Sequence, residues 1–411
     1  MKKPLILAPA GSKKSLIAAI NAGCDEVFFG IGMMNMRASG AVNFSIDNLK
    51  ETVDYCHKNG VKVCVTVNTL LYNSDIPEMK KIIDAIAKSG VDAAIVADMS
   101  TMQYASEKGV EIHISTQLSI SNTESLKFYA KYADRIVLAR ELRLEQVAQI
   151  CKDVIDQDIR GPKGELIEIE VFAHGAICVA VSGRCSMSMY CYDKSANRGQ
   201  CGQACRRKYK ITDVNTGQEL VVDNNYVMSA ADLCTIGMLD KIVEAGVSVL
   251  KFEGRGRPPE YVDLVTRTYK QALQSIEEGK YTTKKIEQWN KDLGTVFNRG
   301  QSAGFYMGRK MDEWAGGNGG KATKKKVFAG KVEYYYPKIK VVQIKVMGKV
   351  EFQKGNEFLI IGDKTGIVKD KFTDILIDDK KVKKAQQGDV ITFKLDQKVR
   401  EEDDFYLWNN A

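Results

Sequence analysis

Short apolar runs alternate with amphipathic helical segments along the first 280 residues. The runs cover residues 5–10, 26–30, 61–68, 92–98, 111–115, 135–140, 168–172 and 248–253. Segments with the 3.6-residue period of a helix lie between them, as at 46–59, and another follows at 260–278. Strands that alternate with helices pair in parallel, because the helix carries the chain back to the same edge. We therefore predict an α/β fold, a TIM-type (β/α)8 barrel.

A doubly wound open sheet is the alternative, but no Gly-rich dinucleotide fingerprint follows any of the runs. In a barrel, the active site forms where the strands end. The polar residues expected at those ends are Asn68, Asp98, Thr116, Gln117, Arg140, Glu170, His174, Lys251, Glu253 and Arg255. Any one of them could instead cap the next helix.

The last quarter of the chain has a different pattern. Residues 316–326 are rich in glycine and lysine without hydrophobic periodicity, so we expect a flexible linker between a barrel at 1–315 and a second domain at 327–411. Short strand-like runs at 327–332, 341–346, 357–361, 373–377 and 390–394 predict a small antiparallel β-barrel. From Lys321 onward there are 20 Lys and Arg against 14 Asp and Glu, so this module carries +6 of the chain's net +8. Such a module can bind RNA phosphates, or be an ordinary solvated surface.

Five of the ten cysteines lie in one segment, which interrupts the barrel after its seventh strand at about 174–210. The residues around them are Gly, Ser, Arg, Asn and Gln, which form turns rather than a core. Thiolates that converge on turns suit a soft metal centre. The spacing C-x6-C-x15-C-x3-C lacks the paired C-x2-C knuckles of zinc ribbons, which favours an iron–sulfur cluster over zinc. Redox-active, nucleophilic or inert thiols are the alternatives.

The apolar run near the N-terminus is too short for a signal peptide or a membrane span. We therefore expect a cytoplasmic protein that does not enter a membrane, and free thiols rather than disulfides.

Peptidase chemistry needs an activated nucleophile or a metal-bound water. The chain contains neither an H-E-x-x-H nor a G-x-S-x-G motif. Of its three histidines, His57 and His113 are expected to be structural, whereas His174 stands beside the cysteine segment. His174 could donate hydrogen bonds to a substrate or cluster, hold the loop, or form a peptidase dyad with Cys178.

Lys251, Glu253 and Arg255 alternate along one predicted strand and therefore share a face. They could form an ion network, or Arg255 could bind a carboxylate through two hydrogen bonds. Glu170 could act as an acid or base at the end of the seventh strand, or cap the cysteine loop.

Several motifs carry a resemblance to a known family. They are the segments 7–11, 170–178, 182–188, 197–206, 229–233, 251–255 and 298–305, and together they resemble the collagenase-like peptidase family U32 over about residues 4–310. The compact Cys201-x3-Cys205 pair resembles the branch of tRNA hydroxylation proteins most.

That branch implies a [4Fe–4S] cluster, oxygen-independent formation of 5-hydroxyuridine at the tRNA wobble position, and prephenate as a cosubstrate. We assign the cluster to Cys178, Cys185, Cys201 and Cys205, and prefer Cys205 to Cys234 because it shares the turn-rich segment; Cys191 also lies there. Arg184, Lys251 and Arg255 would meet the two carboxylates of prephenate. The implied partners are tRNA and a paralogous subunit. A U32 peptidase or a noncatalytic RNA-binding protein is the alternative function.

Overall fold

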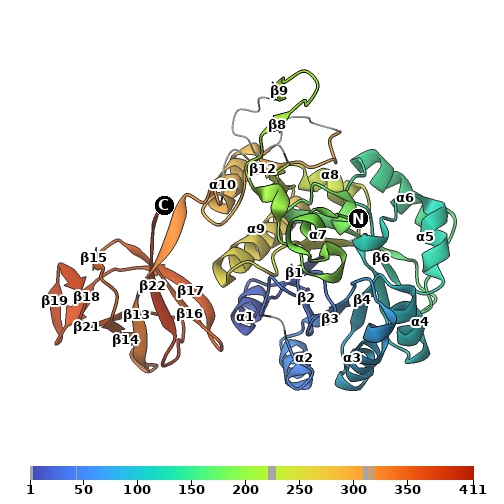
Figure 1. Ribbon diagram of the computed structural model, residues 1–411. Helices are drawn as coiled ribbons and strands as arrows, with labels where there is room; N and C mark the ends of the chain where they lie inside the picture. Colours follow the sequence, from blue (N-terminus) through green and yellow to red (C-terminus); the bar gives the residue numbers. More distant parts are fainter. Residues whose placement is uncertain (1–2, 43, 221–227, 309–313, 316–318) are drawn as a thin grey trace.

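The computed structural model describes residues 3–42, 44–220, 228–308, 314–315 and 319–411. Eight parallel strands form a closed barrel, and an antiparallel domain lies beside it (Figure 1). The barrel strands are β1 (Leu5–Pro9), β2 (Glu26–Gly30), β3 (Lys62–Val67), β4 (Ala93–Val96), β5 (Ile112–Ile114), β6 (Arg135–Val137), β7 (Glu168–Gly175) and β11 (Val249–Phe252). Strand β11 pairs with both β1 and β7, which closes the ring. The predicted TIM-type barrel is confirmed.

Helices cover the outside of the barrel. They are α1 (Lys13–Asn21), α2 (Leu49–Lys58), α3 (Ile76–Ser89), α4 (Met99–Glu107), α5 (Thr123–Ala130), α6 (Leu144–Asp156), α8 (Leu239–Glu244), α9 (Pro259–Glu277) and α10 (Thr283–Leu293). Most turn an apolar stripe inward, as α3 does with Met79, Ile82, Ile83 and Ile86, whereas α10 packs on α9. Gly90 ends α3 in the left-handed region at φ 77°, where glycine meets no Cβ penalty.

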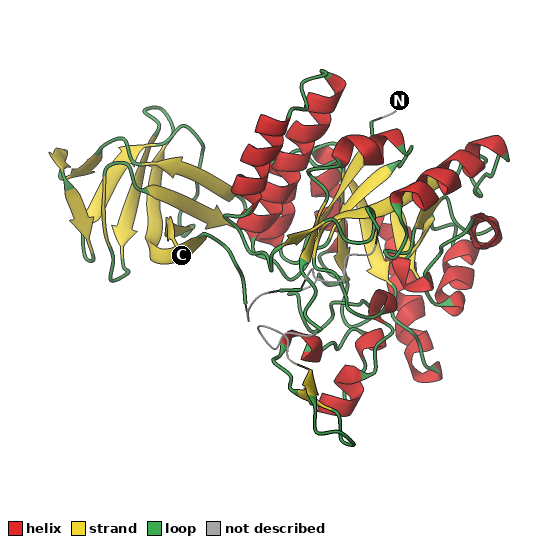
Figure 2. Cartoon of the chain, turned by 90° about the horizontal axis from the view of Figure 1, so that it is seen from above, coloured by secondary structure: helices red, strands yellow, loops and turns green. Residues whose placement is uncertain are grey.

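The cysteine segment leaves β7 at the carboxyl end of the barrel. It contains the short helix α7 (Met187–Tyr192) and the hairpin β8 (Ile211–Thr212) with β9 (Glu219–Leu220). The chain returns as β10 (Asp232–Cys234), which runs antiparallel to β7 and also pairs with β12 (Gln301–Ser302). Figure 2 shows these loops gathered over one end of the barrel. Between β7 and β10 the chain thus contains the predicted cysteine segment at about 174–210 and, after it, this hairpin.

A layer of buried charges crosses the barrel interior. Arg135 contacts Glu26 with both terminal nitrogens, one of them at 2.9 Å, and lies 3.5 Å from Glu170. Glu170 accepts a hydrogen bond of 2.7 Å from Lys251 Nζ. Burial opposes ionisation of Glu26, but Arg135 outweighs it and lowers the pKa of the carboxyl. Each charge is stable in the interior only because its partner is present.

We expect Arg135→Ala to lower the free energy of unfolding by about 3–5 kcal/mol, because Glu26 would be left buried without its cation. The measurement is urea unfolding followed by circular dichroism. Arg160→Ala is the matched control, since Arg160 pairs with Asp158 on the surface and should change stability by less than about 1 kcal/mol. Equal effects of the two substitutions would contradict the prediction.

The second domain is an antiparallel sheet, as predicted. Its strands are β13 (Lys324–Tyr336), β14 (Val341–Val346), β16 (Glu357–Gly362), β17 (Gly366–Lys371), β18 (Ile375–Ile377), β19 (Lys380–Val382), β21 (Val390–Lys394) and β22 (Asp404–Asn410), with β15 (Glu351–Gln353) and β20 (Lys384–Gln386) as a separate pair. The sheet encloses a cluster of phenylalanines: Phe352, Phe358, Phe372, Phe393 and Phe405.

The linker predicted at 316–326 extends into the second domain, because strand β13 already begins at Lys324. Lys324–Lys326 begin β13 and pair with β22, so their backbone is held in the sheet. Lys324 binds Glu357, and Lys326 Nζ lies 3.0 Å from Glu260 of α9. These two lysines are therefore neutralised by carboxylates, not displayed on a flexible tether. Residues 316–318 of the predicted linker lie outside the described residues.

The two domains pack against each other through α1 and α9. Leu359, Ile361 and Trp408 of the second domain belong to the same apolar cluster as the barrel core. Lys14 pairs with Asp404 at 2.9 Å, and the Asn21 amide donates to the Thr365 carbonyl. The second domain is thereby fixed at one side of the barrel (Figure 1).

Candidate metal and anion site at the barrel mouth

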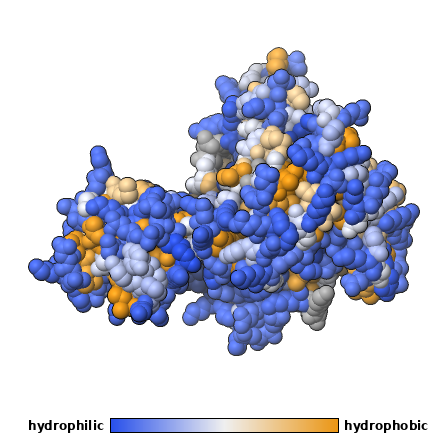
Figure 3. Space-filling model, turned by 90° about the horizontal axis from the view of Figure 1, so that it is seen from below, coloured by the Kyte–Doolittle hydropathy of each residue, from blue (hydrophilic) through white to orange (hydrophobic). Residues whose placement is uncertain are grey.

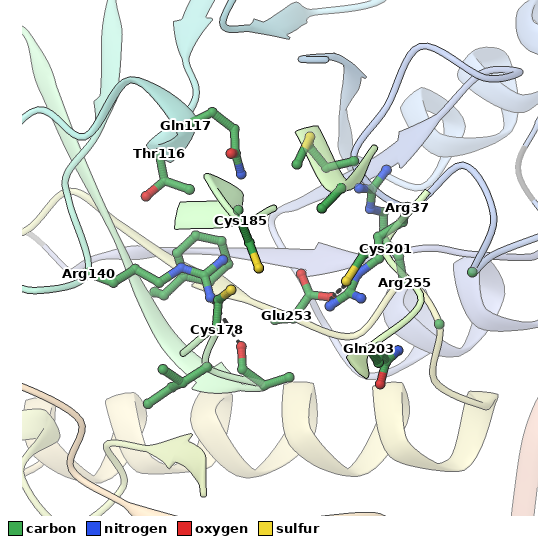
Figure 4. A pocket seen from close by; sticks show the side chains of 18 of the residues that line it. Arg37, Thr116, Gln117, Arg140, Cys178, Cys185, Cys201, Gln203, Glu253 and Arg255 are labelled. Carbon is green, nitrogen blue, oxygen red and sulfur yellow. Dashed lines mark hydrogen bonds and ion pairs between the residues drawn. The ribbon is translucent and has the colours of Figure 1, made fainter. Parts of the chain in front are cut away.

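A cavity of about 230 Å³ lies at the carboxyl ends of the strands. Strand ends form its floor, through residues such as Phe28, Thr66 and Lys251, and the cysteine segment covers it. Figure 4 shows the sulfur atoms of Cys178 and Cys185 in the space between Arg140 and Arg255.

All four predicted cluster ligands line this one cavity: Cys178, Cys185, Cys201 and Cys205. Burial raises the pKa of the Cys205 thiol; Arg206 opposes that rise, and the other three thiols add to it. The four sulfurs are therefore close enough to interact electrostatically. Cys191 is exposed and does not line the cavity.

Cys234 points away from the other cysteines. Its Sγ lies 3.8 Å from Asn290 Oδ1 on α10, and burial raises its pKa to about 11. It does not line the cavity. The placement therefore favours Cys205 as the fourth thiol.

The four thiols are not arranged around one ion. In the part of the chain that the structure describes, no three His, Cys, Asp or Glu side chains are placed to coordinate a single metal. A zinc would need its ligands at about 2.0–2.3 Å from one centre. A cubane cluster instead distributes four thiolates over four irons, so its ligands stand farther apart. The four donors are all thiols, which is the ligand type of an iron–sulfur cluster.

Polar groups also approach the sulfurs. The Met187 amide lies 3.4 Å from Cys185 Sγ, and Ser188 Oγ lies 4.0 Å from Cys201 Sγ. Hydrogen bonds to sulfur are one means by which a protein sets the potential of an iron–sulfur cluster.

The cavity is strongly cationic. Among the described residues that line it, Glu253 is the only carboxylate, against seven cations: Arg37, Arg140, Arg206, Lys251, Arg255, Arg257 and Arg299. Burial opposes ionisation of Glu253, but Arg37, Arg255 and Arg140 outweigh it and lower its pKa to about 2. Arg37 Nε donates to Glu253 Oε1 at 2.9 Å. Glu253 is therefore a fixed anion at neutral pH, and most of the positive charge remains for a ligand.

Arg140 and Arg255, which line the cavity, each have a hydrogen-bond donor that no described residue uses. The Nε atoms of both side chains are buried without a hydrogen-bond partner. Arg255 Nη1 donates to Asn35 Oδ1 at 2.8 Å and to Thr66 Oγ1 at 2.9 Å, which fixes the guanidinium without neutralising it. Burial lowers the pKa of Arg255 to about 10, which leaves it charged at neutral pH. Two fixed guanidiniums with free donors are suited to a carboxylate or phosphate.

Close backbone approach holds the Arg255 strand end in place. A Cβ on Gly11 would stand 1.7 Å from the Arg255 carbonyl oxygen, so only glycine allows the loop after β1 to pack there.

Three predicted site residues lie elsewhere. Glu170 is fully buried in the charge layer and does not line the cavity, because Lys251 and Arg135 hold it in the barrel interior. Arg184 is exposed, donates to the Gln117 carbonyl at 3.2 Å, and does not line the cavity. His174 follows the register shift between β7 and β11 and faces Tyr261 and Tyr269 of α9. Burial lowers the pKa of His174 to about 3, so it is neutral and structural.

The structure brings in residues that sequence reasoning missed. Arg37 and Asn35 come from the loop after β2, whereas Arg206 ends the motif 197–206 and Arg257 follows the motif 251–255. Lys251, Glu253 and Arg255 were expected and do line the cavity, as do Asn68, Thr116, Gln117 and Arg140. Asp98 instead caps α4.

A family model described as peptidase family U32 matches residues 11–316. The chain belongs to this family. A collagenase from Porphyromonas gingivalis is 44% identical over 404 residues, which cover 98% of this chain and 97% of that protein. The tRNA hydroxylation protein P1 of Bacillus subtilis is 30% identical over 97% of this chain and 93% of its own length. The 23S rRNA 5-hydroxycytidine C2501 synthase of Escherichia coli is 33% identical over 75% of this chain and 46% of its own length. The names of these U32 relatives are thus divided between proteolysis and RNA hydroxylation.

None of the helices in the described residues of this U32 protein is long and apolar enough to cross a bilayer. The face shown in Figure 3 is largely hydrophilic, with small apolar patches on both domains.

Proposed function

We propose that this U32 protein is an iron–sulfur enzyme that hydroxylates a tRNA uridine at the wobble position. One observation carries the proposal: four thiols and an excess of guanidinium groups line the same cavity at the barrel mouth. A soft metal centre beside an anion-binding wall is suited to redox chemistry on an anionic substrate. The relatives named for tRNA and rRNA hydroxylation support the choice of reaction.

Cys178, Cys185, Cys201 and Cys205 would hold a [4Fe–4S] cluster, which supplies electron transfer when bound. The protein's own contribution is to enclose the reacting groups. Phe28 and Phe172 line the same cavity and exclude water from its floor. Exclusion of water strengthens every charge interaction there.

The pair Arg140 and Arg255 would bind the carboxylates of a small acid, and prephenate has two of them. The free Nε donors of both arginines are the observation that supports this assignment. Arg140 is stacked on Phe172 with its Cζ 3.9 Å from the ring centroid, so its orientation is set before a ligand arrives. Arg140 takes the role that the sequence assigned to Arg184.

A tRNA uridine must leave the base stack to reach such a cavity, as in other enzymes that modify bases. The net charge of +8 favours association with the polyanion. The proposal also includes a paralogous partner subunit, and this part is supported only by the family resemblance.

The described residues of the cavity do not include the thiol–histidine pair that a cysteine peptidase needs. Within the described residues, the one contact between a thiol and a histidine joins Cys64 Sγ and His113 Nδ1 at 3.8 Å, inside the barrel. Burial and the neighbouring Glu26 raise the pKa of Cys64 well above its ordinary value, so the thiolate is suppressed. His174, the predicted partner of Cys178, bonds Tyr269 instead.

The test uses a strain that lacks this gene and any paralogue. If this protein hydroxylates the wobble uridine, tRNA from that strain should contain no 5-hydroxyuridine or its derivatives. Mass spectrometry of tRNA nucleosides measures this, and the wild-type gene on a plasmid should restore the signal. Normal 5-hydroxyuridine in the deletion strain, with loss of a peptide-cleaving activity, would instead support the peptidase function.

A further inference from the structure

Arg257 is unlike the other cations around the cavity. Lys251, Arg37 and Arg299 each have a carboxylate within 4 Å, and Arg140, Arg206 and Arg255 each donate to carbonyl, amide or hydroxyl oxygens. Within the described part of the chain, the Arg257 guanidinium has neither a carboxylate nor a hydrogen-bond acceptor.

The Arg257 side chain is nevertheless held in place. Its Cζ lies 3.6 Å from the centroid of the Phe297 ring, and Arg299 Cζ lies 5.1 Å from the same centroid. Burial lowers the pKa of Arg257 and the like charge of Arg299 lowers it further, while Asp232 and Glu253, neither of them in contact with it, partly oppose the shift. Among the described residues, the Arg257 guanidinium is thus held by an aromatic ring while its donors stay free, an arrangement that suits a bound anion.

Lys321 is a further cation near Arg299, outside the cavity. Lys321 is exposed, its amide donates to the Asn298 carbonyl at 2.7 Å, and its side chain reaches over Gly300. No carboxylate lies within 4 Å of Lys321 in the described residues. The loop that contains Phe297 and Arg299 therefore joins Arg257 at the cavity wall to Lys321 at the start of the second domain.

We propose that Arg257 and Lys321 bind successive phosphates of the nucleic acid strand whose base enters the cavity. A small acid would need only Arg140 and Arg255 in the cavity. Arg257 and Lys321 extend the positive charge beyond the cavity, which matches a ligand with several charges along its length, such as a nucleic acid strand. The stacked, planar Arg257 can donate two parallel hydrogen bonds to one phosphate. This inference rests on the proposed RNA substrate and adds the residues that position it.

The test measures binding of a uridine-containing tRNA anticodon stem-loop to the intact protein at several salt concentrations. We expect Arg257→Gln to weaken binding roughly tenfold near 0.15 M salt, as the loss of a charged hydrogen bond would. The slope of log K against log salt should also fall by about one, because one phosphate contact is lost. Lys321→Gln should lower the slope by a similar amount, and Arg257→Lys should recover part of the affinity.

Arg267→Gln is the control, because it also replaces an arginine by glutamine and so removes one positive charge. Arg267 is an exposed residue of α9 that pairs with Asp263. It should leave both affinity and slope unchanged. Iron content must match the wild type in every variant, which shows that the cavity is intact.

Two outcomes would overturn the inference. If Arg257→Gln binds RNA with wild-type affinity and wild-type salt dependence, Arg257 does not bind a phosphate, and the proposed function still stands. Weaker binding of a dicarboxylic acid by that variant would then assign Arg257 to the small ligand. If the wild-type protein does not bind the stem-loop at all, the proposed RNA substrate fails as well.

Discussion

Alanine in place of Cys178, Cys185, Cys201 or Cys205 should remove the iron from protein purified without oxygen. The wild-type protein should be brown and contain about four irons per chain, because four thiolates satisfy one cubane cluster. All four residues line one cavity, and they are the set assigned from the family resemblance, with Cys205 preferred to Cys234 because it shares the turn-rich segment. Loss of one ligand should leave a cluster that is incomplete or lost during purification. Iron analysis and the visible absorption spectrum measure the result.

Two cysteines provide matched controls for this experiment. Cys191→Ala and Cys234→Ala should keep the iron, since Cys191 is exposed on α7 and Cys234 contacts Asn290 rather than the cavity. Retained iron in Cys205→Ala with loss in Cys234→Ala would reverse our choice of the fourth ligand. Zinc in place of iron in the wild-type protein would contradict the cluster itself.

The barrel could be predicted because its strands are buried on both faces. Such strands are continuous apolar runs, and each of the eight runs became a barrel strand. The short β10 was not expected, since its three residues give no periodicity and its antiparallel pairing with β7 depends on the excursion that precedes it. Strand β22 follows an acidic run and was also missed, although Phe405 and Leu407 alternate towards the core.

The candidate site was predictable only where strands position it. Lys251, Glu253 and Arg255 agree with the rule that barrel active sites lie at strand ends. The predicted alternation along one strand holds only for Lys251, because β11 ends at Phe252 and the other two residues follow it. Arg37 and Asn35 could not be found, because they reach the cavity from a loop whose placement depends on the cysteine segment; the Asn35 carbonyl lies against Gly199. The side chain of His174 was misplaced because Ala173 is an extra residue of β7 opposite β11, and this register shift changes which face the next residue presents.

Arg255→Ala should abolish wobble-uridine hydroxylation while the iron content stays at the wild-type level. Arg255 lines the cavity but is held by Asn35 and Thr66, so its removal takes away a cation without removing a thiol. An anionic cosubstrate would lose a fixed guanidinium in a buried site, a change that costs about 2–5 kcal/mol and hence at least tenfold in binding. The measurements are 5-hydroxyuridine in tRNA from a complemented deletion strain and iron in the purified variant.

Substitution of Arg255 by lysine separates charge from geometry in this experiment. The ammonium group would keep the positive charge but not the planar fork that bonds Asn35, Thr66 and a ligand at once, so Arg255→Lys should restore only part of the hydroxylation. Arg184→Ala is the matched control: that side chain is exposed and bonds only the Gln117 carbonyl, so its loss should leave both iron and 5-hydroxyuridine unchanged. Full activity of Arg255→Ala would remove Arg255 from the site, whereas loss of iron together with activity would show that it supports the cluster instead of a cosubstrate.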